Sequence, residues 1–116
     1  MNEIHFGRVA SVRIGPNEDL VAGLEAAAAQ LGFARTLVRS GLGSLIDVTF
    51  EGRVGQRGPG FEIACLYGEL GPDVASISGV VGDPAGHVSA GRFLRGANPV
   101  CVTIEAILEE ILPDNV

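Results

Sequence analysis

Short apolar runs separated by turns rich in glycine and proline fill most of this chain after residue 35, and this alternation constrains the fold more than any other feature. Runs of this length, with many valines and isoleucines, are typical of β-strands. The interruptions contain Gly, Pro, Asn, Asp or Ser, which favour chain reversal. We expect strands at residues 37–39, 45–50, 61–70, 74–81, 87–94 and 100–108, with turns or loops at 40–44, 51–60, 82–86 and 95–99.

The residues before this region show a different pattern. Residues 6–14 alternate loosely between apolar and polar and predict a first strand, which Gly15-Pro16 ends. Residues 20–31 repeat apolar side chains at helical spacing. Asn17 can cap this helix, Glu18 and Asp19 suit its positive end, and Gly32 suits the position after its last residue.

Together these elements predict one α+β domain over residues 1–116, with a largely antiparallel sheet of six or seven strands and one main helix packed on it. A chain of 116 residues can bury one core without metal or disulfide support. Residues 109–116 read as a charged tail that can add one helical turn before Pro113. Hydrophobic residues make up 47% of the chain, so we expect another subunit to cover part of its surface.

Charge and cysteine content limit the possible partners and location. The eight basic residues are all arginines, and fourteen carboxylates bring the net charge to −6, which argues against DNA binding by this domain alone. Cys65 and Cys101 lie in apolar runs far apart and predict buried thiols in a reducing compartment. We find no apolar stretch that suits a signal peptide or a membrane span, and expect a cytoplasmic protein without membrane contact.

No catalytic residue or cofactor is predicted. His5 and His87 have no partner at metal-ligand spacing, and the serines lie in no nucleophile motif and near no histidine–carboxylate pair. Residues 41–44 lack the lysine of a phosphate-binding loop and precede a strand, so they are interpreted as a tight turn. Glu62 and Glu105 have apolar neighbours. Each faces solvent on a half-buried strand, or faces inward with Arg92 or Arg39 as its partner.

Five short motifs, in order, resemble those of the PPC domain, the plant and prokaryote conserved domain. The resemblance spans about residues 7–110. The motifs are Gly15 to Leu20 before the helix, Ser40-Gly41-Leu42-Gly43-Ser44-Leu45, Gly60-Phe61-Glu62-Ile63 with the following Gly68-Glu69-Leu70, Gly86-His87-Val88-Ser89-Ala90-Gly91, and Val100 to Leu108 with Glu105. This resemblance implies an antiparallel sheet flanked by helices and assembled as a homotrimer.

Many prokaryotic members of that family carry a His-x-His pair and a later Gly-Gly-His, which suit a divalent metal. The corresponding positions here are Ser76, Ser78 and Arg92. Two hydroxyls and a guanidinium, which has no lone pair, cannot replace three imidazoles, so we predict no metal. Plant members add AT-hooks that enter the DNA minor groove, and this sequence has none.

Two interpretations of function follow. The first is a metal-free homotrimeric binding or assembly module of unknown partner, associated with DNA by family resemblance only. The second is a small-anion-binding protein or an enzyme, with a subunit-interface pocket built from Ser76, Ser78, Arg92 and Glu62. A salt bridge from Arg92 to Glu62 or Glu105 inside the trimer would instead give that arginine a structural role.

Overall fold

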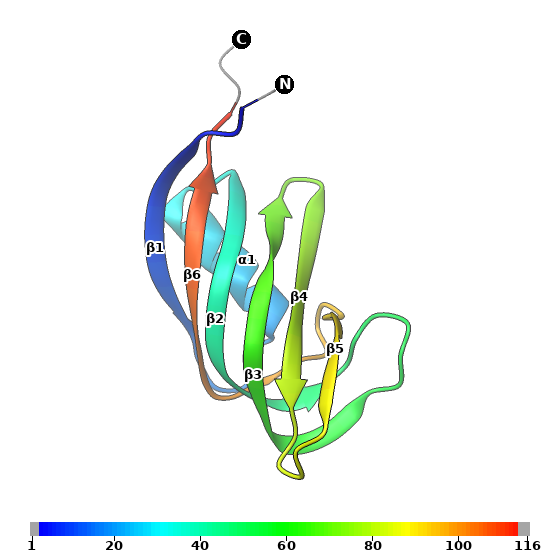
Figure 1. Cartoon of the computed structure of the whole chain (residues 1–116). Coiled ribbons are helices and arrows are strands. Elements are labelled where there is room, and N and C mark those ends of the chain that lie inside the picture. Colours follow the sequence, from blue (N-terminus) through cyan, green and yellow to red (C-terminus); the bar gives the residue numbers. More distant parts are fainter. Residues whose placement is uncertain (1–2, 114–116) are drawn as a thin grey trace.

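The computed structural model describes residues 3–113 and confirms an α+β domain with one antiparallel sheet of six strands (Figure 1). Its order is β1-β6-β2-β3-β4-β5, so the strand at the end of the chain lies between the first two. The elements are β1 (Phe6–Ile14), α1 (Leu20–Leu31), β2 (Arg35–Val48), β3 (Gln56–Gly71), β4 (Val74–Gly82), β5 (Val88–Arg92) and β6 (Val100–Ile111). No helix in the described part of the chain is long and apolar enough to cross a membrane.

The helix ends where the sequence predicts but begins with a different cap. Asp19, rather than Asn17, caps it by accepting a hydrogen bond from the backbone N–H of Ala22 at 2.9 Å. Asn17 instead has a positive φ of 67° in the connection from β1, a conformation that asparagine tolerates well. Gly32 follows the last turn with φ 78°, as the sequence predicts, because glycine adopts this left-handed conformation without steric cost.

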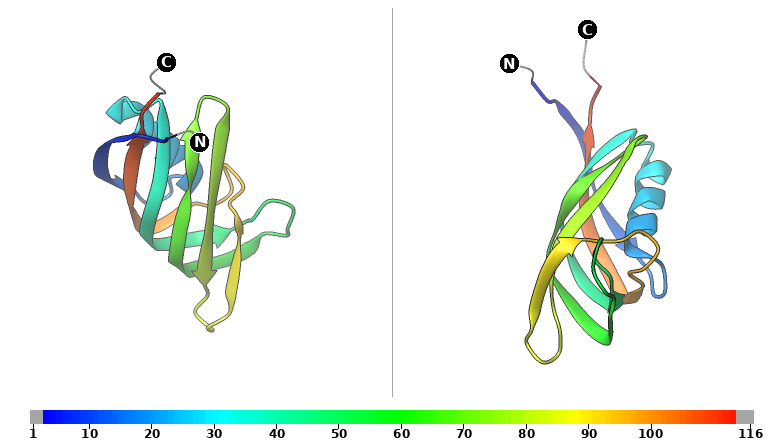
Figure 2. Two further views of the ribbon diagram at one scale, coloured as in Figure 1. Left: turned by 45° about the horizontal axis from the view of Figure 1, so that its top comes forward. Right: turned by 90° about the vertical axis from the view of Figure 1, so that its right-hand side faces the viewer.

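The core lies on one side of the sheet, where the helix and a pair of phenylalanines pack against it. The helix covers one part, and its close approach leaves no room for a side chain at Gly23, where a Cβ would lie 2.6 Å from Ile14. Phe50 and Phe93 cover another part, with their ring centroids 5.1 Å apart. Figure 2 shows the helix on one side of the curved sheet. The largest fully buried side chains are Phe50, Leu20, Leu24, Leu45, Leu66, Ile77, Ile104 and Leu108.

The predicted turn at residues 40–44 is wrong, because β2 runs through it without reversing. The strand is irregular there, and its register with β6 shifts at Val38/Ser40 and again at Gly43/Leu45. The two glycines serve close packing instead. A Cβ at Gly41 would lie 2.4 Å from the Leu66 side chain, and one at Gly43 would lie 2.0 Å from the Thr103 carbonyl oxygen. The predicted strands on either side are therefore one strand.

Three smaller predictions also change. Residues 56–60 of the predicted loop belong to β3, and residues 109–111 complete β6 instead of forming a helical turn. The last residues of the predicted tail, 114–116, lie outside the described part. Cys65 is exposed and Cys101 half-buried, so neither is a buried thiol. The reason for Cys65 is a register shift between Ile63 and Cys65, which keeps the thiol from the core side of β3.

A buried asparagine holds the connection between β5 and β6 against the rest of the fold. Asn98 is fully buried, and its side chain accepts from the N–H of Thr49 and donates to the carbonyl oxygens of Thr49 and Leu94. Its backbone N–H donates to the carboxylate of Asp19, the residue that caps the helix. One residue therefore joins the helix start, the end of β2 and this connection.

Candidate functional site

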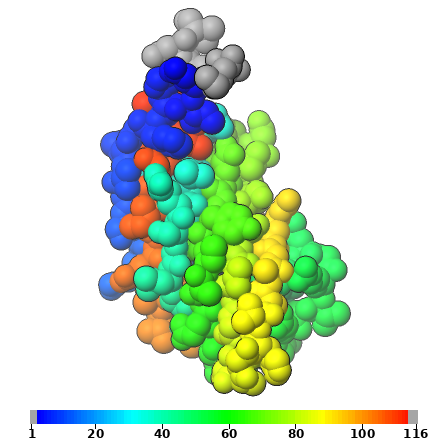
Figure 3. Space-filling view, viewed as in Figure 1, coloured from blue at the N-terminus to red at the C-terminus, as the bar shows by residue number. Residues whose placement is uncertain are grey.

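The sheet face opposite the helix, here called the outer face, is covered by no element of residues 3–113 and faces the viewer in Figure 3. Direct partners across an antiparallel sheet point to the same side, so the register identifies its residues. One row across it consists of Val9, Glu109, Leu37, Glu69 and Ser76. Large apolar side chains are exposed here, among them Leu42 at 62% and Val88 at 71%. An outer face in contact with water would instead be mostly polar.

Ion pairs neutralise most charges on the outer face. Arg13 lies 2.8 Å from Glu105, Arg39 lies 2.7 Å from Glu109, and Arg35 lies 2.8 Å from Glu69. The predicted inward-facing alternative for Glu105, with Arg92 or Arg39, is therefore wrong. These arginines are occupied by carboxylates of this chain, which reduces the positive charge available to an anionic partner.

The structure brings three of the four predicted site residues together. Ser78 lies directly opposite Arg92 on β5, and Ser76 lies two residues along β4 on the same face. Glu62 lies apart, because its partner on β4 is Gly82. Four residues of strand separate Gly82 from Ser78, or about 13 Å.

Tyr67 is a member of this cluster that the sequence analysis missed. It lies directly opposite Ser78 on β3, and its side chain is half exposed. Strict alternation from the buried Phe61 and Ile63 would have placed Tyr67 on the core side. The register shift between Ile63 and Cys65 turns it outward, and the pairing of β3 with β4 puts it beside Ser78.

Within one chain, Arg92 contacts Glu51 and neither Glu62 nor Glu105, and a salt bridge to either of them inside the trimer stays a prediction. The Arg92 Nη1 lies 3.5 Å from Oε2 of Glu51. Glu51 follows β2 and comes close because its backbone N–H donates to the carbonyl oxygen of Arg92 at 2.7 Å. The partner of Arg92 is thus decided by how the β2–β3 connection folds against β5.

A hollow of about 360 Å³ lies beside this cluster on the outer face. Leu37 and Val74 give it apolar walls, while the Glu69 carboxylate is held by Arg35. Gly68 has no side chain to fill it. Its remaining lining residues are Tyr67, Ser76 and Ser78.

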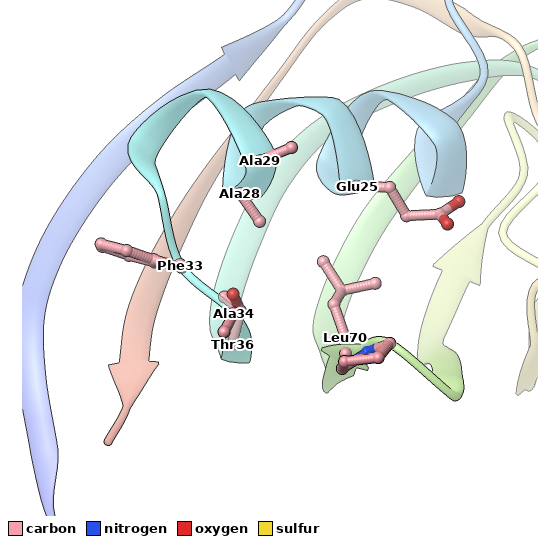
Figure 4. Close-up of a pocket in the computed structure, with 9 residues that line it drawn as sticks. Glu25, Ala28, Ala29, Phe33, Ala34, Thr36 and Leu70 are labelled. Atoms are coloured by element: carbon pink, nitrogen blue, oxygen red, sulfur yellow. The ribbon is translucent and has the colours of Figure 1, made fainter. Parts of the chain in front are cut away.

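A second hollow, of about 350 Å³, lies on the other side of the sheet beneath the end of the helix (Figure 4). Leu70 points toward the helix there, and the Glu25 carboxylate points away from Thr36. The Thr36 hydroxyl makes no hydrogen bond within residues 3–113, and the residue is only 1% exposed. Thr36 lines this hollow, but most of the other lining residues are apolar, so we interpret the space as imperfect packing.

Two carboxyl groups outside the cluster have a lowered pKa. A hydrogen bond from the Arg8 side chain lowers the pKa of Glu110, assisted by the backbone N–H of Arg8. In the turn between β4 and β5, the backbone N–H of His87 lowers the pKa of Asp83. The His87 ring also contacts this carboxylate at 3.1 Å. Both sites stabilise local chain geometry at exposed positions.

The residues that the family resemblance aligns with three metal-binding histidines do not fit a metal. Ser76, Ser78 and Arg92 lie together, but an arginine is cationic and offers no lone pair. Within residues 3–113, no group of three His, Cys, Asp or Glu side chains is arranged to hold a metal ion.

The Plants and Prokaryotes Conserved (PCC) domain, the family also written PPC, matches residues 1–112. The chain belongs to this family. Comparison with curated protein sequences gives no match.

Solved structures with the PPC fold resemble the chain closely in shape and weakly in sequence. A hypothetical protein from Salmonella enterica has a TM-score of 0.82 at 24% identity, over 95% of this chain and 81% of that one. A PPC protein from Pyrococcus horikoshii has a TM-score of 0.79 at 19% identity, over 100% and 87%. A metal-containing protein from Archaeoglobus fulgidus has a TM-score of 0.76 at 18% identity, over 97% and 85%. These likenesses show the shared fold.

Proposed function

We propose that this PPC domain is a homotrimeric binding or assembly module whose subunits meet on the outer face. The observation that carries the proposal is the set of exposed apolar side chains on that face, with Leu42 62% exposed at its centre. Full burial of a leucine side chain contributes about 1.5–3 kcal/mol, so a subunit that covered several of them would bind favourably. The number three comes from the family resemblance. We place the module in the cytoplasm, where its free thiols at Cys65 and Cys101 stay reduced.

Light scattering coupled to size exclusion tests the assembly directly. We expect wild-type protein to have about three times the 12.0 kDa chain mass. Leu42→Asp places a charge on the outer face and should reduce the mass to that of one chain, because a buried unpaired carboxylate is strongly unfavourable. Val54→Asp is the matched control, since Val54 is 91% exposed in the connection between β2 and β3.

The control variant should keep the wild-type mass. A wild-type chain that elutes as a folded monomer would refute the assembly. A Leu42→Asp variant that keeps the full mass would show that subunits meet elsewhere. Circular dichroism of each variant confirms that a change in mass does not result from unfolding.

We propose further that this domain does not bind DNA by itself. Six of its eight arginines contact carboxylates of the same chain, and the net charge is −6. Phosphate contacts from basic side chains supply most non-specific affinity for DNA. In a mobility-shift titration at low salt, we expect no retardation of duplex DNA at micromolar protein. A retarded band that disappears as salt is raised would contradict this prediction and restore a DNA-binding role.

A further inference from the structure

Three strands of the outer face place unused hydrogen-bond donors side by side. Tyr67 lies opposite Ser78, and Ser78 lies opposite Arg92. Adjacent strands are about 4.8 Å apart, so one small molecule can reach neighbouring members of the row. Among residues 3–113, the hydroxyls of Tyr67 and Ser78 donate to no protein acceptor, and Arg92 makes only its ion-pair contact with Glu51.

Arg92 differs from the other arginines that contact carboxylates. Hydrogen bonds join each of the others to its partner: Arg8 to Glu110, Arg13 to Glu105, Arg35 to Glu69, Arg39 to Glu109 and Arg95 to Glu25. The 3.5 Å separation of Arg92 from Glu51 is long for a charge-assisted hydrogen bond. A guanidinium has five N–H donors, so Arg92 can bind a second carboxylate in a forked geometry.

The hollow beside this row complements the donors. Leu37, Val74 and the Tyr67 ring give it apolar surface. The Glu69 carboxylate lies at the end of the hollow toward Ser76, its cross-strand partner, whereas Arg92 lies across from Ser78. The Arg92 end therefore offers hydrogen-bond donors to an anion, whereas the Glu69 carboxylate offers none, and this difference sets the orientation of the anion.

We propose that this row and hollow bind a small monocarboxylate with an apolar body. Arg92 and Ser78 bind the carboxylate, and Leu37, Val74 and the Tyr67 ring contact the body. Glu62 takes no part, because it lies about 13 Å along the sheet. The site goes beyond assembly of the module, since it assigns a ligand class to one part of the outer face.

Benzoate is a suitable probe because it joins one carboxylate to a compact apolar ring, and benzamide is its uncharged counterpart. Amide chemical shifts in ¹H–¹⁵N spectra of the full chain, titrated with each probe, locate and measure binding. We expect benzoate to shift residues of β3, β4 and β5 around Ser78, and to bind more tightly than benzamide. Arg92→Gln should weaken benzoate binding about tenfold or more, as loss of a charged hydrogen-bond partner does.

Arg13→Gln is the matched control, because Arg13 lies on the same face but is bonded to Glu105 outside the hollow. Its benzoate affinity should equal that of the wild type. Equal binding of benzoate and benzamide, unchanged affinity in Arg92→Gln, or no benzoate shifts at millimolar concentration would each overturn the site. Mass measurement in the same buffer separates the two proposals: a trimer without benzoate binding refutes only the site, and a monomer that binds benzoate refutes only the assembly.

Discussion

Asn98→Ala is expected to lower the free energy of unfolding by about 4 kcal/mol, a large part of the 5–15 kcal/mol that stabilises a typical domain. The substitution leaves the N–H and carbonyl groups of Thr49 and the carbonyl of Leu94 without their side-chain partner. The Thr49 N–H is then unpaired, which costs about 1–3 kcal/mol. The two carbonyls keep their bonds from the backbone N–H groups of Leu94 and Ala97, and each loses a second bond worth about 0.5–1.5 kcal/mol. Urea denaturation followed by circular dichroism, at one fixed protein concentration, measures the change.

Gln56→Ala is the control for this prediction. Gln56 carries the same amide group, but its side chain makes one bond, of 3.2 Å, to the half-buried Ser89. Loss of this hydrogen bond should lower the free energy of unfolding by about 1 kcal/mol or less. If the two variants had equal stability, Asn98 would not be the residue that ties the β5–β6 connection to the helix start.

Gly43→Ala is expected to be at least as damaging, because the added methyl group meets backbone and not a movable side chain. A Cβ at Gly43 would lie 2.0 Å from the Thr103 carbonyl oxygen and 2.9 Å from the Ile104 Cα, and φ is 137°. Strand β6 must move away from β2 to admit it. We expect the free energy of unfolding to fall by more than about 4 kcal/mol. The variant should then unfold at a much lower urea concentration or fail to accumulate as folded protein.

Gly52→Ala is the control that measures the effect of backbone strain without a steric clash. Gly52 also has a positive φ, of 74°, yet a Cβ there would have no neighbour within 4 Å. This substitution should lower the free energy of unfolding by about 1–2 kcal/mol, because alanine is less stable than glycine in the left-handed conformation. A Gly43→Ala protein as stable as Gly52→Ala would show that β2 and β6 can separate at this point without disturbing the sheet.

Gly41 and Gly43 illustrate why part of the fold escapes sequence reasoning. Glycines and serines in a short segment favour a turn, and the sequence therefore predicts one at residues 40–44. In the structure they allow β2 to pass close to β3 and β6. The same residues serve either purpose, and the choice depends on strands that lie far away along the chain.

The residues of the candidate site could likewise be predicted only in part from the sequence. The sequence indicated Ser76, Ser78 and Arg92 as a group, and the sheet places them on one face. It could not identify Tyr67 as their neighbour or Glu51 as the contact of Arg92. It also grouped Glu62 with them, because sequence offers no measure of distance along a sheet.

The sequence by itself determined the order of the elements, the class of the fold and the end of the helix at Gly32, because hydrophobic period and backbone preference act over a few neighbouring residues. Only the tertiary structure decided the strand order β1-β6-β2-β3-β4-β5, the ion-pair partners and the buried role of Asn98. These depend on contacts between distant segments, whose geometry exists only once the sheet has formed.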